Sequence, residues 1–269
     1  MGERIAVDVR DGIADVRLAR PDKLNALDLA MFEALVDTGQ RLAGERGLRA
    51  VVLSGEGRAF SAGLDFASFM AMGDGGAERP ARGLLDREPG QAANWAQQAA
   101  WVWTELPVPV IAAIHGVAYG GGLQIALAAD VRFVAPDARL SVREIQWGLI
   151  PDMTATQTLR FLVRLDVAKE LTFTGRVVSG TEAVALGLAT HVSDTPREAA
   201  FELAREIAGR SPSAVRAAKR LLNEAPRGSV EDGLRLEEQL QRGLMGRPNQ
   251  IEAVQANLAK REPRFVDPE

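Results

Sequence analysis

The chain contains no cysteine and only two histidines, His115 and His191, among its 269 residues. The lack of cysteine excludes disulfide scaffolds, cysteine zinc sites, thiol nucleophiles and iron–sulfur clusters. Two imidazoles are too few for a multi-histidine metal site, so we expect no bound metal. Aromatic residues make up 5% of the chain, which leaves few surfaces on which single-stranded nucleic acid could stack.

An excess of one charge is also lacking, because 36 acidic residues face 32 basic ones and the formal net charge is -4. This balance argues against a nucleic-acid partner held by bulk positive charge. Charged residues interrupt the N-terminal stretch, so we expect no export signal and a cytoplasmic location. The uncharged segment Leu106–Ala129 contains prolines and a glycine triplet. These residues predict a buried strand, a turn and a buried helix rather than a membrane span, and we expect no membrane partner.

The apolar patterns that are present predict a mixed α/β core in the first two thirds of the chain. Alternating residues on either side of Asp11-Gly12 predict a β-hairpin, and Asp28 is expected to cap a helix. Short apolar runs predict buried strands at Arg49–Leu53 and Val108–Ile114. The segment Ala71–Gln91 has no periodicity and predicts a loop or a lid.

The C-terminal third is expected to be helical. Ser211 and Ser229 precede periodic apolar runs and are expected to cap two helices. We place the boundary at Pro196, which gives a core of residues 1–195 and a helical region of residues 196–269. Apolar stripes in this region need a partner surface, in the same subunit or in a neighbouring one.

Three segments carry residues suited to chemistry: Arg58–Asp65 (RAFSAGLD), Ile111–Gln124 (IAAIHGVAYGGGLQ) and Ser141–Asp152 (SVREIQWGLIPD). The glycine triplet lets the backbone approach a ligand closely, and the helix after it directs the positive end of its dipole to the same point. A backbone N–H there and a second from the Ala62-Gly63-Leu64 turn could form an oxyanion hole with two donors. Steric need alone could also explain glycine in either turn.

The order and spacing of these segments resemble the crotonase superfamily, the enoyl-CoA hydratase/isomerase family, over nearly the whole chain. Further segments that look like this family are Arg20–Leu27, Phe173–Ala183 and Gly187–Val192. The resemblance implies an α/β fold in which ββα units form a spiral, with a C-terminal helical region for trimerisation. It also implies an acyl-CoA substrate, as in fatty-acid metabolism, with coenzyme A entering as part of the substrate and no separate cofactor.

Residue roles follow from the same resemblance. The N–H groups of Leu64 and Gly121 would hold the thioester oxygen. The residues expected to bind other parts of the substrate are Lys23, Leu24, Ala62, Asp65, Gly120 and Gln124. The acyl tunnel would be lined by residues between Phe66 and Gln98, including Phe66, Met70, Met72 and Trp95. The resemblance further implies a homotrimer or a dimer of trimers.

The reaction depends on Gln124, Glu144 and Asp152. Hydratases of the family use two glutamates to activate water, and one of those positions is Gln124 here, which cannot exchange a proton at neutral pH. Glu144 together with Asp152 is similar to the proton-shuttling pair of dienoyl-CoA isomerases, although that group also has an acid at the Gln124 position. We therefore favour proton-transfer isomerisation of an unsaturated acyl-CoA, with Glu144 as the principal base and Asp152 as its partner.

Other interpretations stay open from the sequence. On the same scaffold the outcome could be hydration, hydrolysis of an acyl- or aryl-CoA, or dehalogenation, although the dehalogenase branch carries tryptophan at the Glu144 position. The chain could also be an acyl-CoA binding protein without activity. It could bind RNA through basic residues of the helical region, namely Arg205, Arg210, Arg216, Lys219 and Arg220. Asp152 could be a helix cap instead of an acid, and Glu144 could be a surface residue in a salt bridge.

Overall fold

The computed structural model describes residues 3–68 and 83–267 of the chain. Its strands are β1 (Ile5–Arg10), β2 (Ile13–Leu18), β3 (Ala50–Gly55), β4 (Val110–Ile114), β5 (Val117–Tyr119), β6 (Val131–Val134), β7 (Arg139–Ser141), β8 (Val178–Ser179) and β9 (His191–Val192). Its α-helices are α1 (Leu29–Ala43), α3 (Trp95–Glu105), α4 (Gly121–Leu127), α5 (Ala155–Leu162), α6 (Leu165–Thr174), α7 (Gly180–Leu186), α8 (Pro196–Ala208), α9 (Pro212–Glu224), α10 (Val230–Leu244) and α11 (Pro248–Ala259). The short 3₁₀ turns are η1 (Pro21–Lys23), η2 (Glu144–Trp147) and η3 (Ala225–Arg227).

Two sheets organise the core. The larger has six strands in the order β1-β2-β3-β4-β6-β9, and the smaller has three in the order β5-β7-β8. Strands β1 and β2 are antiparallel, whereas every later neighbour in the large sheet is parallel. Two successive passes of the chain each place one strand in the large sheet and the next in the small one, namely β4 with β5 and β6 with β7. These passes are the expected ββα units.

The hairpin and the first helix cap are confirmed. Asp11 and Gly12 both have positive φ, at 51° and 76°, as a tight two-residue turn requires. Asp28 caps α1, because its side chain accepts a hydrogen bond from the N–H of Met31 at 2.9 Å. Ser211 and Ser229 cap α9 and α10 in the same way.

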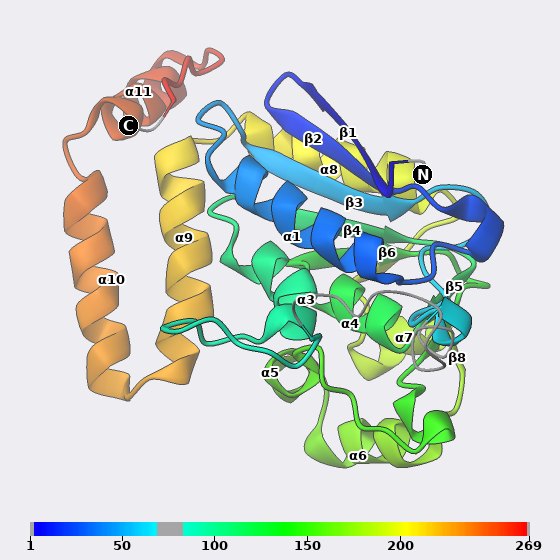
Figure 1. Ribbon diagram of the computed structural model, residues 1–269. Helices are drawn as coiled ribbons and strands as arrows, with labels where there is room; N and C mark the ends of the chain where they lie inside the picture. The colour runs from blue at the N-terminus through cyan, green and yellow to red at the C-terminus, as the bar shows by residue number, and fades with distance from the viewer. Residues whose placement is uncertain (1–2, 69–82, 268–269) are drawn as a thin grey trace.

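The large sheet is covered by helices on both faces (Figure 1). Alternate residues of β3 point in opposite directions, so Val51 and Leu53 belong to one apolar cluster and Ala50 and Val52 to another. The first cluster includes residues of α1, α3 and α4, and the second includes residues of α8. The expected buried strand and helix within Leu106–Ala129 are β4 and α4, and the short strand β5 between them was not predicted. No helix among the described residues is long and apolar enough to cross a membrane.

The C-terminal helices differ in how they meet this core. Helix α8 packs on β3, β4 and β6, while α9 and α10 stand beside each other at one side of the molecule (Figure 1). The boundary at Pro196 stays a prediction, although α8 contributes Ala200 and Ala204 to the core. Of the expected loop, residues 71–82 lie outside the described residues, and residues 83–91 form turns without helix or strand.

Candidate active site

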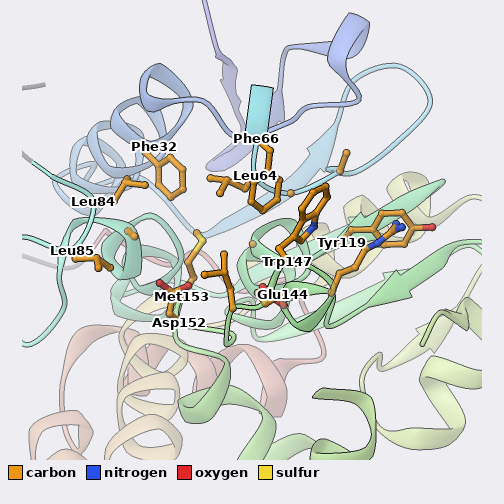
Figure 2. Close-up of a pocket in the computed structure, with 17 residues that line it drawn as sticks. Phe32, Leu64, Phe66, Leu84, Leu85, Tyr119, Glu144, Trp147, Asp152 and Met153 are labelled. Carbon is orange, nitrogen blue, oxygen red and sulfur yellow. The ribbon is translucent and has the colours of Figure 1, made fainter. Parts of the chain in front are cut away.

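A pocket opens where the ends of several elements meet below α1 (Figure 2). It is lined by Phe32, Ala62, Gly63, Leu64, Phe66, Leu84, Leu85, Ala96, Tyr119, Gly120, Gly121, Arg143, Glu144, Trp147, Leu149, Asp152 and Met153. Its wall is mostly apolar, and the acidic side chains on it are Glu144 and Asp152. The pocket therefore brings together the four residues expected to carry the chemistry.

The N–H of Leu64 is directed by a single β-bridge. Leu64 pairs with Leu27 in parallel orientation. In this bridge Leu27 donates to the carbonyl of Gly63 at 2.8 Å, and Asp65 donates to the carbonyl of Leu27 at 3.0 Å. The neighbours of Leu64 thus make the bridge, and its own N–H points to the other side. That N–H has no backbone acceptor among the described residues.

The second donor, the N–H of Gly121, stands at the start of α4. As the first residue of the helix, Gly121 has no carbonyl within the helix to bond. Gly120 before it has φ 51° and ψ -124°, a conformation that L side chains rarely adopt. A Cβ on Gly63 would lie 2.5 Å from the carbonyl oxygen of Tyr119 and 3.6 Å from the N–H nitrogen of Gly121. The two turns consequently lie against each other, with both free N–H groups at the pocket.

Glu144 begins η2 and is 9% exposed. Its Oε1 accepts a hydrogen bond from Nε2 of Gln124 at 2.6 Å, while its Oε2 is buried without a hydrogen-bond partner among the described residues. Burial raises the pKa of Glu144, and the nearby charge of Asp152 adds to this against opposing hydrogen bonds. Glu144 is therefore not the exposed, salt-bridged residue of the alternative interpretation.

Gln124 lies behind this carboxylate rather than on the described pocket wall. It is 2% exposed. Its Oε1 accepts hydrogen bonds from the N–H groups of Met153 at 2.8 Å and Ala155 at 3.1 Å. The role of Gln124 in substrate binding stays a prediction, because the hydrogen bonds of its side chain all go to other residues of the protein.

Asp152 lies in the loop before α5 and lines the same pocket as Glu144. Asp152 is exposed as a residue, and the partial removal of its carboxylate from water raises its pKa. The alternative in which Asp152 caps a helix is wrong, because α5 begins at Ala155 and its N-cap residue is Thr154. The alternative placed the cap at the wrong residue because Thr154 adopts a left-handed conformation, with φ 78°. Threonine rarely adopts this conformation, so the sequence does not predict it.

The residues expected at the coenzyme A end form a connected group, except for Lys23. The N–H of Ala62 donates to the carbonyl of Leu24 at 2.9 Å. Asp65 forms an ion pair with Arg20 at 2.8 Å and a hydrogen bond with Ser68 at 2.7 Å. Lys23 is exposed at the end of η1 and is not part of the described pocket lining.

Sequence reasoning missed Asn25, which holds this group together. Asn25 is fully buried, and its side-chain amide donates to the carbonyls of Glu56 at 2.9 Å and Ala59 at 2.8 Å. Its Oδ1 accepts from the N–H of Arg20 at 2.8 Å. These hydrogen bonds fix the turn between η1 and α1. The signal in the sequence that could have identified Asn25 was a polar residue between the apolar Leu24 and Ala26.

The apolar wall agrees only partly with the expected acyl tunnel. Phe66 lines the pocket and stacks on Trp147, with ring centroids 4.0 Å apart (Figure 2). Trp95 is not in the described lining and packs instead against Phe32, at a centroid distance of 6.1 Å. Met70 and Met72 lie outside the described residues. Two residues of the wall were not predicted because they belong to other segments. Phe32 is on the apolar face of α1, and Trp147 is in the 3₁₀ turn η2.

The sequence of the chain is similar to those of known proteins of one family. The model of the enoyl-CoA hydratase/isomerase family matches residues 8–268. A mitochondrial protein of Mus musculus named Delta(3,5)-Delta(2,4)-dienoyl-CoA isomerase is 32% identical over 94% of this chain and 79% of its own length. A putative enoyl-CoA hydratase of Thermus thermophilus is 34% identical over 96% of this chain and 100% of its own.

The fold of the chain is also similar to the folds of solved structures. The crystal structure of an enoyl-CoA hydratase from Bacillus anthracis superposes with a TM-score of 0.86 at 31% identity, over 97% of this chain and 98% of that one. A putative enoyl-CoA hydratase from Streptomyces coelicolor also reaches a TM-score of 0.86 at 33% identity, over 98% and 94% of the two chains. The expected crotonase fold is confirmed. The chain belongs to the enoyl-CoA hydratase/isomerase family.

Proposed function

We propose that the protein isomerises an unsaturated acyl-CoA by proton transfer, with Glu144 as the principal base and Asp152 as its partner. One observation carries the proposal. The two carboxylates line the same pocket as the free N–H groups of Leu64 and Gly121. Two donors and two acids in one apolar pocket are the groups that this reaction requires.

The reaction would begin with the thioester oxygen between the N–H groups of Leu64 and Gly121. Oε2 of Glu144 removes a proton from the α-carbon or from a vinylogous carbon, and the resulting enolate places negative charge on the thioester oxygen. Each N–H donor typically contributes about 3 kcal/mol to such a charged state. Asp152 then returns a proton further along the conjugated chain, so that the double bond moves and the substrate's composition is unchanged.

The directions of the pKa shifts of the two acids support this sequence of steps. Burial raises the pKa of both Glu144 and Asp152, which strengthens the ionised form of each as a base. Asp152 also raises the pKa of Glu144 by charge repulsion. Two neighbouring carboxyl groups that disfavour double ionisation readily hold one proton between them, and a shuttle needs one acid and one base.

Coenzyme A would enter past the group formed by Leu24, Ala62 and Asp65, with Lys23 available to meet a phosphate. The carboxylate of Asp65 is engaged by Arg20 and Ser68. We therefore assign Asp65 to shaping this entrance and leave contact with coenzyme A to the backbone. No separate cofactor is needed, because the chemistry moves only protons.

Hydration is the second candidate, and the relatives named as hydratases favour it. Against it stands the direct contact of 2.6 Å between Gln124 and Glu144. That contact uses the space in which a water molecule would be held between the two side chains. Hydrolysis, dehalogenation and binding without turnover are distinguished from isomerisation by their products.

The test is product analysis by mass spectrometry in heavy water, with a mixture of 2-enoyl-, 3-enoyl- and 3,5-dienoyl-CoA esters. Isomerisation predicts a product with an unchanged skeleton, a shifted retention time and incorporated deuterium. A product heavier by one water would replace isomerisation with hydration. Free coenzyme A would indicate hydrolysis, and binding without any product would indicate an acyl-CoA binding protein.

We further propose that the protein is a homotrimer or a dimer of trimers, with α10 and α11 at the contact between subunits. These helices carry exposed apolar residues, including Val230 at 81%, Leu234 at 59% and Leu258 at 81%. Sedimentation at the mass of one chain would contradict this assembly. The cytoplasmic location stays a prediction.

A further inference from the structure

We propose that Gln124 is a positioning residue that couples the two acids of the pocket, because its amide holds Glu144 and the segment after Asp152 at the same time. The proposal rests on the proposed function, since it gives Gln124 a part in how Glu144 and Asp152 are used. It differs from the expected role of Gln124 as a group that contacts substrate.

The geometry around Gln124 leaves little freedom to its side chain. The side chain is buried on α4, and three hydrogen bonds engage it: one from Nε2 to Glu144 at 2.6 Å, and two to its Oε1 from Met153 at 2.8 Å and Ala155 at 3.1 Å. Both lone pairs of the amide oxygen are therefore used. A helix of the core thus fixes η2 and the loop before α5 through one amide.

The first consequence concerns which oxygen of Glu144 reacts. Oε1 is held by the amide of Gln124, whereas Oε2 is buried without a partner among the described residues. Oε2 is thus the oxygen of Glu144 that the described residues leave free of a hydrogen bond, and we assign proton exchange to it. A donor to Oε1 also favours the ionised form and so opposes the effect of burial on the pKa of Glu144.

The second consequence concerns Asp152. Thr154 adopts a left-handed conformation at φ 78°, which is unfavourable for a residue with a branched Cβ. The two N–H groups on either side of Thr154, those of Met153 and Ala155, both donate to Gln124. Gln124 accordingly stabilises a turn that would otherwise relax, and Asp152 immediately precedes this turn.

The experiment separates the two halves of the amide. Gln124→Met removes the donor and the acceptor, whereas Gln124→Glu keeps an acceptor for the two N–H groups and replaces only the donor to Glu144. Gln98→Met is the matched control, because Gln98 is 9% exposed and donates to Glu105 at 2.8 Å outside the pocket. For each variant, kcat and KM are measured across pH with the ester that the wild type converts.

We expect Gln124→Met to lower kcat by about 100-fold, in the range of a misplaced acid or base, with KM changed by less than about 3-fold. Gln124→Glu should move the acid limb of the kcat/KM profile upward by at least about one pH unit, because two facing carboxyls must share a proton. Gln98→Met should leave both unchanged. Wild-type kcat and an unmoved acid limb in the Gln124 variants would overturn the proposal, as would an equal loss in Gln98→Met.

A readout without turnover keeps this test separate from the proposed reaction. In protein labelled with ¹³C at glutamate carboxyl carbons, the Glu144 resonance is identified by its disappearance in Glu144→Gln. Its titration midpoint should rise in Gln124→Met relative to wild type, whichever reaction the enzyme performs. If Gln124→Met does not fold, the same ¹³C titration is made on Gln124→Glu, which retains the backbone acceptor and should also raise the midpoint. An unchanged midpoint would refute the coupling, whereas a changed midpoint without isomerisation would refute only the proposed function.

Discussion

The side chain of Glu144 is both buried and, within the described part of the chain, incompletely hydrogen-bonded. Its carboxylate is buried in a mostly apolar wall, yet one of its oxygens has no hydrogen-bond partner among the described residues. Burial disfavours the charge and raises the pKa, so the ionised group is a stronger base than an exposed glutamate. In the proposed reaction, this basicity would serve to remove a carbon-bound proton.

The pH dependence of the wild-type enzyme follows from this environment. Glu144 must be ionised to act as a base, and its pKa in the folded protein lies above the ordinary value of 4.5. Activity should therefore be lost as the pH falls through that raised pKa. Measurement of kcat/KM from pH 4 to 9, with a check that the protein stays folded, should place the acid limb above 4.5; a midpoint at or below 4.5 would contradict the assignment.

Removal of the base should separate binding from turnover. Glu144→Gln keeps the size of the side chain but cannot accept a proton, so kcat should fall by about 10² to 10⁴-fold. Binding of coenzyme A, measured by calorimetry, should stay within about 3-fold because the entrance near Leu24 and Ala62 is untouched. Asp152→Asn is the companion variant, and it should stop isomerisation while Glu144 still exchanges substrate protons with heavy water. Unchanged turnover in Glu144→Gln would exclude Glu144 as the base.

Helix α1 shows how an element can be fixed by one residue at its start. Asp28 accepts from the N–H of Met31 and pairs with Arg4 at 2.7 Å. Burial alone would raise the pKa of Asp28, but the hydrogen bonds from Arg4 and Met31 outweigh it and lower the pKa below 3.8. The cap is therefore strongest when the carboxylate is charged, and it lies beside the entrance residues of the pocket.

Substitution at this cap should destabilise the protein measurably. Asp28→Ala should lower the free energy of unfolding by about 1 to 2 kcal/mol at neutral pH, as measured by urea denaturation. Asp28→Asn keeps an acceptor for Met31 but not the charge opposite Arg4, so its loss should be smaller. Because the folded pKa lies below 3.8, this contribution is present above pH 3.8 and is lost as the pH falls through the folded value. A difference that grows on acidification would contradict the assignment.

The elements that sequence reasoning predicted correctly are those encoded within a few residues. The hairpin at Asp11-Gly12 and the caps at Asp28, Ser211 and Ser229 depend on local turn and cap chemistry. The contacts that it could not predict join distant segments. Gln124 contacts Glu144 and Met153, and Asp65 pairs with Arg20, because the fold brings together segments that are far apart in the sequence. Such partners are set by the packing of elements and not by any local pattern.

At the scale of the whole molecule, Lys219 fastens α9 to the core. Its Nζ forms an ion pair with Asp130 at 2.8 Å and donates to the carbonyls of Trp103 at 3.2 Å and Val108 at 2.9 Å. The side chain is only 5% exposed. Sequence reasoning placed Lys219 on a basic surface that could meet RNA, but the structure buries it, because its long apolar stem and its charge are both satisfied inside.

Loss of this lysine should affect the stability of the entire protein. Lys219→Met would leave Asp130 without its cation and two buried carbonyls without a donor. We expect the free energy of unfolding to fall by about 3 kcal/mol, at the low end for a broken buried pair because Asp130 keeps some access to water. Arg210→Met, which removes an exposed pair with Glu206, should cost less than about 1 kcal/mol. Equal losses in the two variants, measured by urea denaturation, would show that Lys219 is no anchor.

The strand order has a consequence for how the protein is made on the ribosome. In both sheets each new strand lies beside one that was synthesised before it, in the orders β1-β2-β3-β4-β6-β9 and β5-β7-β8. Every strand after the first of its sheet can therefore be added to an edge that already exists, without the insertion of a late strand between two early ones. The described pocket wall ends at Met153. The residues that line the pocket can thus come together while α9, α10 and α11 are still being synthesised.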